Sequence, residues 1–185
     1  MASSKTQVDT TYATPKTWAT GDALTATNMN DELRDEIIAV KTPAHAYGKV
    51  DEASNYSINT TTWTDVDATN LAMTVITSGG VVDVWFNTNL YYVSGTGTTF
   101  AYFDINVDGS RQGGDDGLVH LEITSTLTAS SQIVRCYVSG LSAASHTFKL
   151  QWKRITGTSM IAGMYAGAGT TNHDIHPTMG LREIT

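Results

Sequence analysis

The stretch Thr147-Phe148-Lys149-Leu150-Gln151-Trp152-Lys153 decides the fold class. Its large apolar residues alternate with polar ones, and successive side chains of a β-strand point to opposite faces of a sheet. We therefore expect a strand with one buried face and one face in water, which is typical of an antiparallel sheet that covers a core.

On both sides of this stretch, the chain after Pro43 consists of short strand-like runs separated by turn residues. Glycine-rich separators such as Ser78-Gly79-Gly80 favour hairpin turns, because none precedes a helix or carries the lysine of a phosphate-binding loop. About eight to ten strands with regular turns predict an antiparallel jelly-roll β-sandwich. We expect the strands at 46–50, 61–66, 72–76, 81–92, 99–107, 118–126, 132–139, 147–155, 159–165 and 178–183.

The composition agrees with one mainly β domain that carries an appendage. A chain of 185 residues can bury a sizeable core but is too short for two ordinary domains and a linker. Charged residues make up 16% of the chain, which is well below the usual quarter, and Thr, Ser, Asn and Gly are abundant instead. Threonine suits a pleated, half-buried surface, and Gly with Asn and Asp suits tight turns.

Charge and composition argue against several classes of partner. The net charge of -7 would repel a phosphate backbone, so we expect no nucleic acid. No run of eighteen apolar residues and no signal-peptide core occurs, so we expect no membrane insertion, and we expect the chain to assemble in a cytoplasm. Cys136 is the single cysteine, which excludes an intrachain disulfide.

The segment 1–21 is polar and aperiodic apart from Tyr12 and Trp18, so alone it cannot offset the entropy of ordering its chain. We expect an extended arm that lies on a partner, because polar termini are ordered only when something holds them. The arm and the helix that follows it form the first unit, 1–44, and the sandwich forms the second, 45–185.

The segment 24–41 is the one stretch with convincing helical periodicity. Its apolar residues share one face, Thr25 suits the N-cap, and Thr42-Pro43 ends the helix. Such a short amphipathic helix is marginal in water unless its apolar face is covered. This face must therefore pack on the chain's own domain, on copies of itself or on another protein; of these we favour another protein, with a docking site at Trp18, Leu24, Met29, Leu33, Ile37 and Val40.

Catalytic and metal-binding patterns are weak. No Gly-x-Ser-x-Gly elbow occurs, so acyl transfer lacks a recognisable nucleophile. His173 and His176 resemble metal ligands, but the sequence places no third ligand beside them, and a surface loop is the favoured interpretation. The acidic residues could suggest calcium, but their spacing is not that of an EF-hand and hairpin turns explain them better; they are Asp104, Asp108, Asp115 and Asp116. We predict no catalytic residue, no metal and no cofactor.

The aromatic residues lie in the strand-like runs, so we expect them in the core or between subunits; they are Trp63, Trp85, Tyr91, Tyr92, Tyr102, Phe103, Tyr137 and Trp152. The apolar, glycine-rich stretch 160–169 predicts an inner strand near a symmetry axis, where small residues let chains approach each other.

The N-terminal stretch 14–35 resembles a motif near the N-termini of minor tail and tail-fibre proteins of tailed bacteriophages. The pattern runs Thr-Trp-x-x-Gly-x-x-Leu-Thr-Ala-x-x-x-Asn and continues to an Arg-Asp pair. This stretch covers about an eighth of the chain, and its matching residues are Thr17, Trp18, Gly21, Leu24, Thr25, Ala26, Asn30, Arg34 and Asp35.

The stretch 140–153 resembles a late strand of the jelly rolls of the C1q and tumour-necrosis-factor type that phages use, and the ending Gly180-Leu181-Arg182-Glu183-Ile184 resembles their final strand. This resemblance implies a homotrimer around a threefold axis. Together the two resemblances imply a non-enzymatic structural protein on the surface of a virion, attached to other virion proteins by its N-terminal segment.

Three functions remain open at this point. The first is a tail-fibre or tail-tip protein that binds a host surface glycan or protein, and the N-terminal motif favours it. The second is a capsid decoration or head-fibre protein, which the small size favours. A host-glycan depolymerase is a distant third, because no long repeat typical of such enzymes occurs.

Overall fold

The computed structural model describes residues 3–8, 19–20, 23, 25–27, 43–124, 129–155, 161–168 and 174–184. The described part is mainly β, as the alternating patterns predict. The strands are β1 (Ser4–Val8), β2 (His45–Lys49), β3 (Tyr56–Ile58), β4 (Thr64–Asp65), β5 (Ala72–Ile76), β6 (Val81–Ser94), β7 (Thr98–Val107), β8 (Ser110–Arg111), β9 (Val119–Thr124), β10 (Ser130–Val138), β11 (Ser145–Arg154), β12 (Ile161–Met164) and β13 (Thr178–Ile184).

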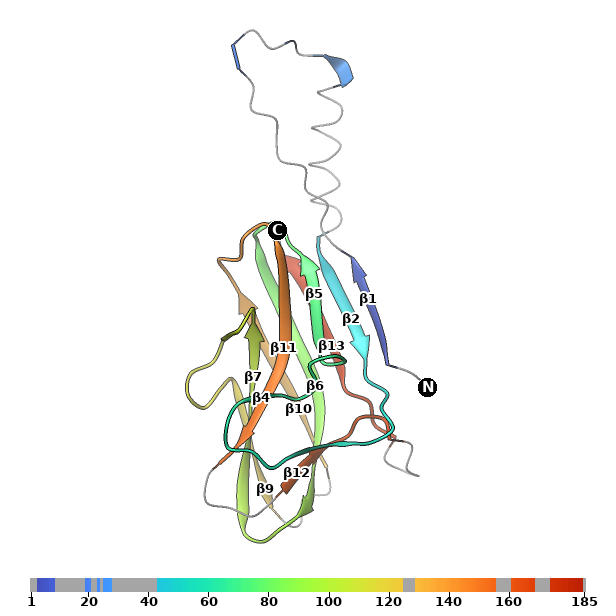
Figure 1. Ribbon diagram of the computed structural model, residues 1–185, viewed down its shortest axis with the longest axis vertical. Coiled ribbons are helices and arrows are strands. Elements are labelled where there is room, and N and C mark those ends of the chain that lie inside the picture. Colours follow the sequence, from blue (N-terminus) through green and yellow to red (C-terminus); the bar gives the residue numbers. More distant parts are fainter. Residues whose placement is uncertain are drawn as a thin grey trace.

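The strands form two antiparallel sheets that enclose one core. Sheet A has the order β1-β2-β13-β6-β12-β3, and β10 pairs with the other side of β6. Sheet B has the order β4-β11-β7-β8, with β5 on the same side of β11 as β4 and β9 on the same side of β7 as β8. Most strands run along the long axis of the sandwich, and β1 and β2 form one lateral edge (Figure 1).

The core lies between the sheets because most of the long strands alternate between buried and accessible residues, although the second half of β7 is buried throughout. In β6, Val82, Val84 and Phe86 are fully buried, whereas the residues between them are only half-buried. The same alternation in β11 buries Phe148 and Leu150 and leaves Lys149 between them accessible. Each fully buried apolar side chain contributes roughly 1.5–3 kcal/mol relative to an exposed one.

Asp108 and Gly109 form the tight turn between β7 and β8. Their φ angles are 49° and 92°, so both lie in the left-handed region that a two-residue hairpin of the primed type requires. The prediction that Asp-Gly at this place is a hairpin turn is therefore confirmed.

The predicted strands differ from the observed ones mainly where the alternation is weak. The expected strand 72–76 coincides with β5, but the expected strand 61–66 shrinks to Thr64–Asp65, and β3 and β8 are additional. These short strands carry no long alternating pattern, and their pairing depends on neighbours that are distant in the sequence.

Strand β1 corrects the expectation that the whole N-terminal arm lies on a partner. Ser4–Val8 pairs antiparallel with β2 of the same chain, from Ser4 opposite Lys49 to Val8 opposite His45. The segment is extended as expected, but the edge of sheet A satisfies its backbone hydrogen bonds. Ala26 and Thr27 are helical and Thr25 is not, whereas Leu24 and residues 28–41 of the expected helix lie outside the described residues.

Candidate self-association surface

The outward face of sheet A is the candidate functional site. The registers of β2, β13, β6 and β10 place residues in rows across it, and one row is Tyr47, Gly180, Trp85 and Arg135. The next row is His45, Arg182, Asp83 and Tyr137. We call this surface the sheet A face and define it by His45, Tyr47, Asp83, Trp85, Asn87, Ile133, Arg135, Tyr137, Gly180, Arg182 and Ile184.

Large apolar side chains are concentrated on the sheet A face. Among the described residues, four of the six exposed large hydrophobic side chains lie on it: Tyr47, Ile133, Tyr137 and Ile184. Ile133 is 64% exposed and Tyr137 is 61% exposed, and both project from β10. Single exposed hydrophobic residues are ordinary, but a group of them on one face indicates a surface that a partner covers.

Gly180 creates a notch between two aromatic side chains on this face. A Cβ atom at Gly180 would lie within 2.2 Å of the Trp85 ring, so the indole lies directly over the glycine. Tyr47 stands on the other side of Gly180 and is 56% exposed. The resulting depression of about 500 Å³ is lined by Pro43, His45, Ala46, Tyr47, Trp85, Leu181 and Arg182.

An ion pair crosses the same face beside Trp85. Arg135 donates from Nε to Asp83 Oδ1 at 2.8 Å and from Nη2 to Asp83 Oδ2 at 2.6 Å. Its Nη2 also donates to the Tyr137 hydroxyl at 3.1 Å, and the hydrogen bonds to Asp83 raise the pKa of Arg135. This bidentate geometry holds the arginine flat over the Tyr137 ring, 5.3 Å from its centroid.

Strand β10 forms the lateral edge of sheet A opposite β1. It pairs with β6 alone along nine residues, from Ser130 opposite Leu90 to Val138 opposite Val82. A long edge strand with exposed apolar residues is a template for pairing or aggregation unless another surface covers it. The edge of β10 and the apolar residues on its outward side therefore point to the same need for a partner.

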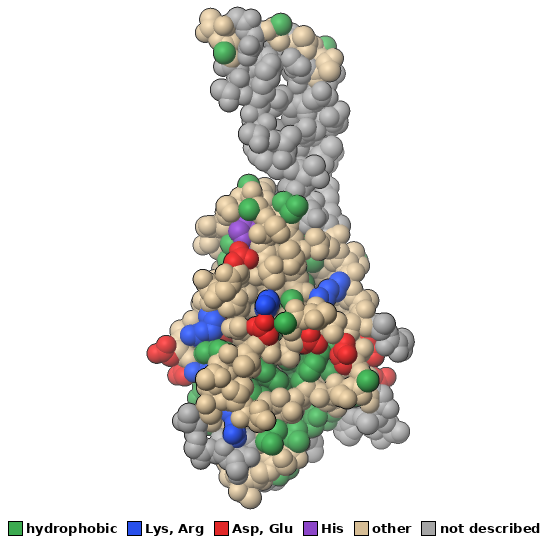
Figure 2. Space-filling view, in the orientation of Figure 1, with side chains coloured by type: hydrophobic (Ala, Val, Ile, Leu, Met, Phe, Trp, Pro, Cys, Tyr) green, Lys and Arg blue, Asp and Glu red, His purple; other side chains and the backbone are tan. Residues whose placement is uncertain are grey.

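The outward face of sheet B contrasts with this surface, because its side chains contact one another. Asp65 accepts from Lys149 Nζ at 2.9 Å and from Gln151 Nε2 at 2.7 Å. Lys153 Nζ lies over both the Trp63 ring, at 5.0 Å, and the Tyr102 ring, at 5.2 Å. Figure 2 shows acidic and basic side chains interspersed over the visible surface, without a large field of either sign.

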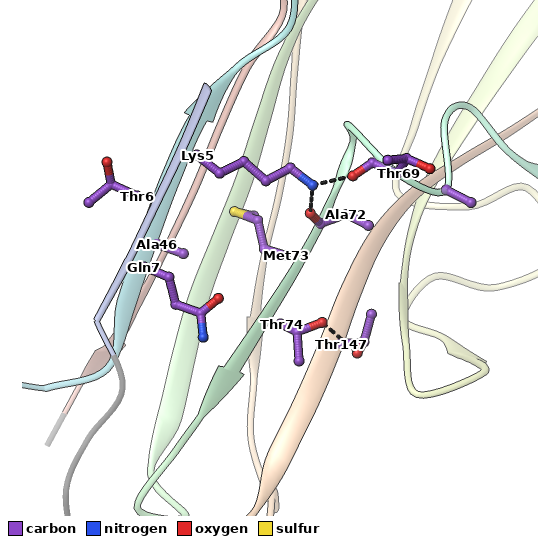
Figure 3. Close-up of a pocket in the computed structure, with 10 residues that line it drawn as sticks. Lys5, Thr6, Gln7, Ala46, Thr69, Ala72, Met73, Thr74 and Thr147 are labelled. Atoms are coloured by element: carbon purple, nitrogen blue, oxygen red, sulfur yellow. Dashed lines mark hydrogen bonds between the residues drawn. The ribbon is translucent and has the colours of Figure 1, made fainter. Parts of the chain in front are cut away.

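A second depression lies between β1 and β5 at the lateral edge of the sandwich (Figure 3). Lys5 reaches across it from β1, and its ammonium group donates to the carbonyl oxygens of Thr69 and Ala72. Burial lowers the pKa of Lys5, but both carbonyls bind the protonated form. Lys5 thus links β1 to the turn before β5, and its ammonium group is engaged in structural hydrogen bonds.

The acidic residues that could suggest calcium do not converge on one point. Asp104 is fully buried, and it accepts from the backbone N–H groups of Ile105 and Gly113 and from Arg111. Asp108 binds His146 and the backbone N–H of Thr147, whereas Asp115 and Asp116 are exposed at a loop tip. No group of three potential metal ligands occurs among the described residues.

His176 has a structural environment in a loop beside the end of β2. Its Nδ1 lies 2.8 Å from the carbonyl oxygen of Val50, and its Nε2 lies 3.2 Å from Asp174 Oδ1. His173 lies outside the described residues. The described half of this histidine pair therefore ties its own loop to the sandwich.

The sequence identified this surface only in part. Trp85 and Tyr137 were expected in the core or between subunits, and both lie on the sheet A face, while Phe103 and Trp152 are in the core. Tyr47 and Ile133 were missed, although each is an apolar residue at an outward position of an alternating strand. The predicted docking residues Trp18, Leu24, Met29, Leu33, Ile37 and Val40 all lie outside the described residues.

Further expectations concern the glycine-rich stretch 160–169, the single cysteine and membrane insertion. Residues Ala162, Met164 and Ala166 of the glycine-rich stretch are buried within the subunit itself. Cys136 is a free cysteine, and burial raises its pKa to about 11. Within the described residues no helix is both long and apolar enough to cross a membrane.

Comparison with known proteins gave no relative: no protein-family model and no curated protein matches the chain.

Proposed function

We propose that this chain is a non-enzymatic structural protein of a tailed-phage virion, which forms homotrimers through the sheet A face and is attached by its N-terminal segment. The concentration of exposed apolar side chains on one face of the sandwich carries the proposal. The motif in 14–35 supports the phage assignment, and the strand order supports the trimer.

The pairing of the main strands supports a jelly roll. Its main strands are β2, β5, β6, β7, β9, β10, β11 and β13, and the first of these pairs with the last, the second with the next to last, and so on inward. A long antiparallel hairpin that is rolled into two sheets produces these pairs. This connectivity agrees with the resemblance of the stretch 140–153 to C1q and tumour-necrosis-factor jelly rolls.

The sheet A face offers two unlike halves for contact with a second copy. Ile133 and Tyr137 project from β10 at one side, and the notch between Tyr47 and Trp85 lies toward the other side. If β10 of one subunit packs against the notch of the next, the contact joins two different surfaces, and repeating it around an axis closes a ring. Each large apolar side chain that becomes buried contributes roughly 1.5–3 kcal/mol, and a trimer repeats the contact at every subunit.

Several carboxylates of the described residues have structural hydrogen bonds. The carboxylates of Asp65, Asp104 and Asp108 are occupied by hydrogen bonds to neighbouring groups. These bonds stabilise turns and strand pairs.

A matched pair of lysine substitutions tests the proposed interface. Ile133→Lys places a charge on the exposed part of the sheet A face, whereas Ile76→Lys places the same charge at an isoleucine of sheet B that is 47% exposed. We expect the first variant to be monomeric and the second trimeric, as measured by light scattering after size-exclusion chromatography. A monomeric wild-type chain, or a trimeric Ile133→Lys variant, would contradict the proposed interface.

The copy number of the protein in purified virions tests its place in the particle. We propose a tail-fibre or tail-tip protein, which predicts a small fraction of the copy number of the major capsid protein in quantitative mass spectrometry. A copy number close to that of the capsid protein would instead favour capsid decoration. Absence from virions would refute the structural role.

The docking role of the N-terminal segment has its own test. We expect Trp18→Ala to prevent incorporation into virions while the purified full-length variant retains the thermal stability of the wild type. Normal incorporation of this variant would contradict attachment through the predicted docking residues.

A further inference from the structure

His146 occupies a position in which both ring nitrogens meet hydrogen-bond acceptors. It is the second residue of β11, and its side chain is 9% exposed. Nδ1 lies 2.6 Å from Asp108 Oδ2, and Nε2 lies 2.9 Å from the backbone carbonyl oxygen of Ser142.

The two acceptors define the proton state that fits the site. A carbonyl oxygen has no proton to give, and a carboxylate at neutral pH has none either, so both ring nitrogens must donate. Neutral imidazole carries only one N–H, whereas imidazolium carries two. Burial alone would lower the pKa of His146, but the hydrogen bonds to Asp108 and Ser142 outweigh it, and the pKa is raised.

While the ring is charged, this geometry also excludes His146 as the base of a hydrolytic triad, although Ser142, His146 and Asp108 supply the three residue types. The Ser142 hydroxyl oxygen is 3.5 Å from Nε2, and the nearer partner of Nε2 is the carbonyl oxygen of the same residue. Because Nε2 donates to that carbonyl, it has no free lone pair with which to accept a proton from the hydroxyl group.

Three separate segments meet at His146. Asp108 belongs to the turn after β7, and its Oδ1 also accepts from the backbone N–H of Thr147 at 2.8 Å. The Ser142 carbonyl accepts a second hydrogen bond from Thr77 Oγ1 at 3.0 Å, and the Thr77 N–H donates to the Ala144 carbonyl at 3.0 Å. The loop 139–144 is thus held on one side by the residue that follows β5 and on the other by His146.

The same end of the sandwich receives the chain from its N-terminal segment. Glu183 is buried, and its Oε1 accepts from the backbone N–H groups of Ser78 and Gly80, which follow Thr77. The Glu183 N–H donates to the carbonyl oxygen of Ala44. The contacts of His146 therefore lie close to the point at which the N-terminal segment enters β2.

We propose that His146 is a proton-operated latch, which holds the loop 139–144 to the turn after β7 when the imidazole is charged and releases it when the imidazole is neutral. Asp108 is the charged group that faces the ring. The neighbours from the other elements packed against it, Val75 of β5 and Ser142 of the loop, carry no charge.

The direction of the pH dependence follows from the raised pKa. The latch is fully closed below the ordinary histidine pKa of 6.5, and it opens as the pH rises through the higher pKa of the folded protein. Opening removes one hydrogen bond to a charged donor, because the neutral ring can serve only one of its two acceptors.

Amide hydrogen exchange of the full-length chain at about pH 5.5 and about pH 8.5 tests the latch, since this range spans the titration of histidine but not of ordinary carboxylates. We expect the protection factors of amides in 139–147, corrected for intrinsic exchange, to be roughly tenfold lower at the higher pH, the size expected for loss of one such hydrogen bond. Equal protection at both pH values would overturn the proposal.

Two histidine variants identify the titrating group. His146→Gln removes the titration, so protection should be low at both pH values, whereas His120→Gln at an exposed histidine of β9 should keep the wild-type dependence. Persistence of the pH dependence in His146→Gln would overturn the assignment. If His146→Gln does not fold, Asp108→Asn serves instead: it removes the charge that favours imidazolium and should move the loss of protection to lower pH, and an unmoved midpoint would contradict the latch.

Discussion

The outward faces of the two sheets differ in whether their own side chains satisfy one another. On sheet B, Asp65 binds Lys149 and Gln151, and Lys153 lies over Trp63 and Tyr102. On sheet A, Tyr47 and Ile133 are more than half exposed and have no comparable cover. On the outward face of sheet B the side chains contact one another, whereas on that of sheet A large apolar groups stay exposed, as they do on surfaces that bind other molecules.

The difference lies in the outward positions of the strands, since both sheets bury their inward positions equally well. Outward residues of β11 are Lys149, Gln151 and Lys153, whose polar ends find partners on adjacent strands. Outward residues of β10 are Ile133, Arg135 and Tyr137, of which only the arginine has an acidic partner, Asp83. Substitutions at matched positions of the two faces test this contrast.

The largest effect is expected at Gly180, where a side chain must displace the Trp85 ring. Gly180→Val should lower the free energy of unfolding by about 1–3 kcal/mol, as overpacking does, and should weaken trimer formation because the notch is lost. Urea denaturation and light scattering measure the two effects. Gly114→Ala is the control, because a Cβ atom there would meet nothing within 4 Å; equal effects of both variants would show that the notch has no special role.

A smaller effect is expected from the two ion pairs, one on each face. Asp83→Asn leaves Arg135 on the sheet A face without its carboxylate. We expect this variant to associate clearly more weakly, with only a small decrease in the melting temperature of the subunit. Asp65→Asn removes the matching pair with Lys149 on sheet B and should lower the melting temperature without changing association. Sedimentation velocity and thermal denaturation distinguish the two variants, and the reverse pattern would contradict the assignment of faces.

The contribution of Asp65 should also depend on pH with a defined sign. Burial alone would raise the pKa of Asp65, but the hydrogen bonds from Gln151 and Lys149 lower it overall. Its contribution is therefore present above the unfolded-state pKa of about 3.9 and disappears as the pH falls through the lower pKa of the folded protein. The difference in melting temperature between wild type and Asp65→Asn should shrink toward about pH 3; a difference that grows on acidification would refute this origin.

The smallest effect is expected at Lys153, which needs no partner molecule. Lys153→Met keeps most of the apolar stem and removes the charge over the Trp63 and Tyr102 rings. We expect a loss of roughly 0.5–1 kcal/mol in urea denaturation and no change in oligomeric state. A shift to monomer would mean that sheet B, too, takes part in association.

The sequence predicted those strands that carry a long alternation. The expected range 81–92 lies within β6, and the expected strand 72–76 coincides with β5. Strand β1 was expected to lie on a partner because Ser4, Lys5, Thr6 and Gln7 offer no apolar face, and no local pattern shows that the edge of β2 is free to pair with them. The exposed positions of Ile133 and Tyr47 were also hidden, since an apolar residue in a strand is ordinarily read as core.

Three features follow from the sequence alone: the secondary structure class, the turn at Asp108 and Gly109, and the alternation of buried and accessible residues along the long strands. They do so because they depend on residues that are close together in the chain. Which accessible sides of the strands share a face depends on the tertiary structure. Tyr47, Trp85, Ile133 and Gly180 come from four strands that are distant in sequence, and pairing across β2, β13, β6 and β10 brings them together. Asp108, Ser142 and His146 come together for the same reason. The turns between strands place them side by side, and no local sequence pattern predicts those positions.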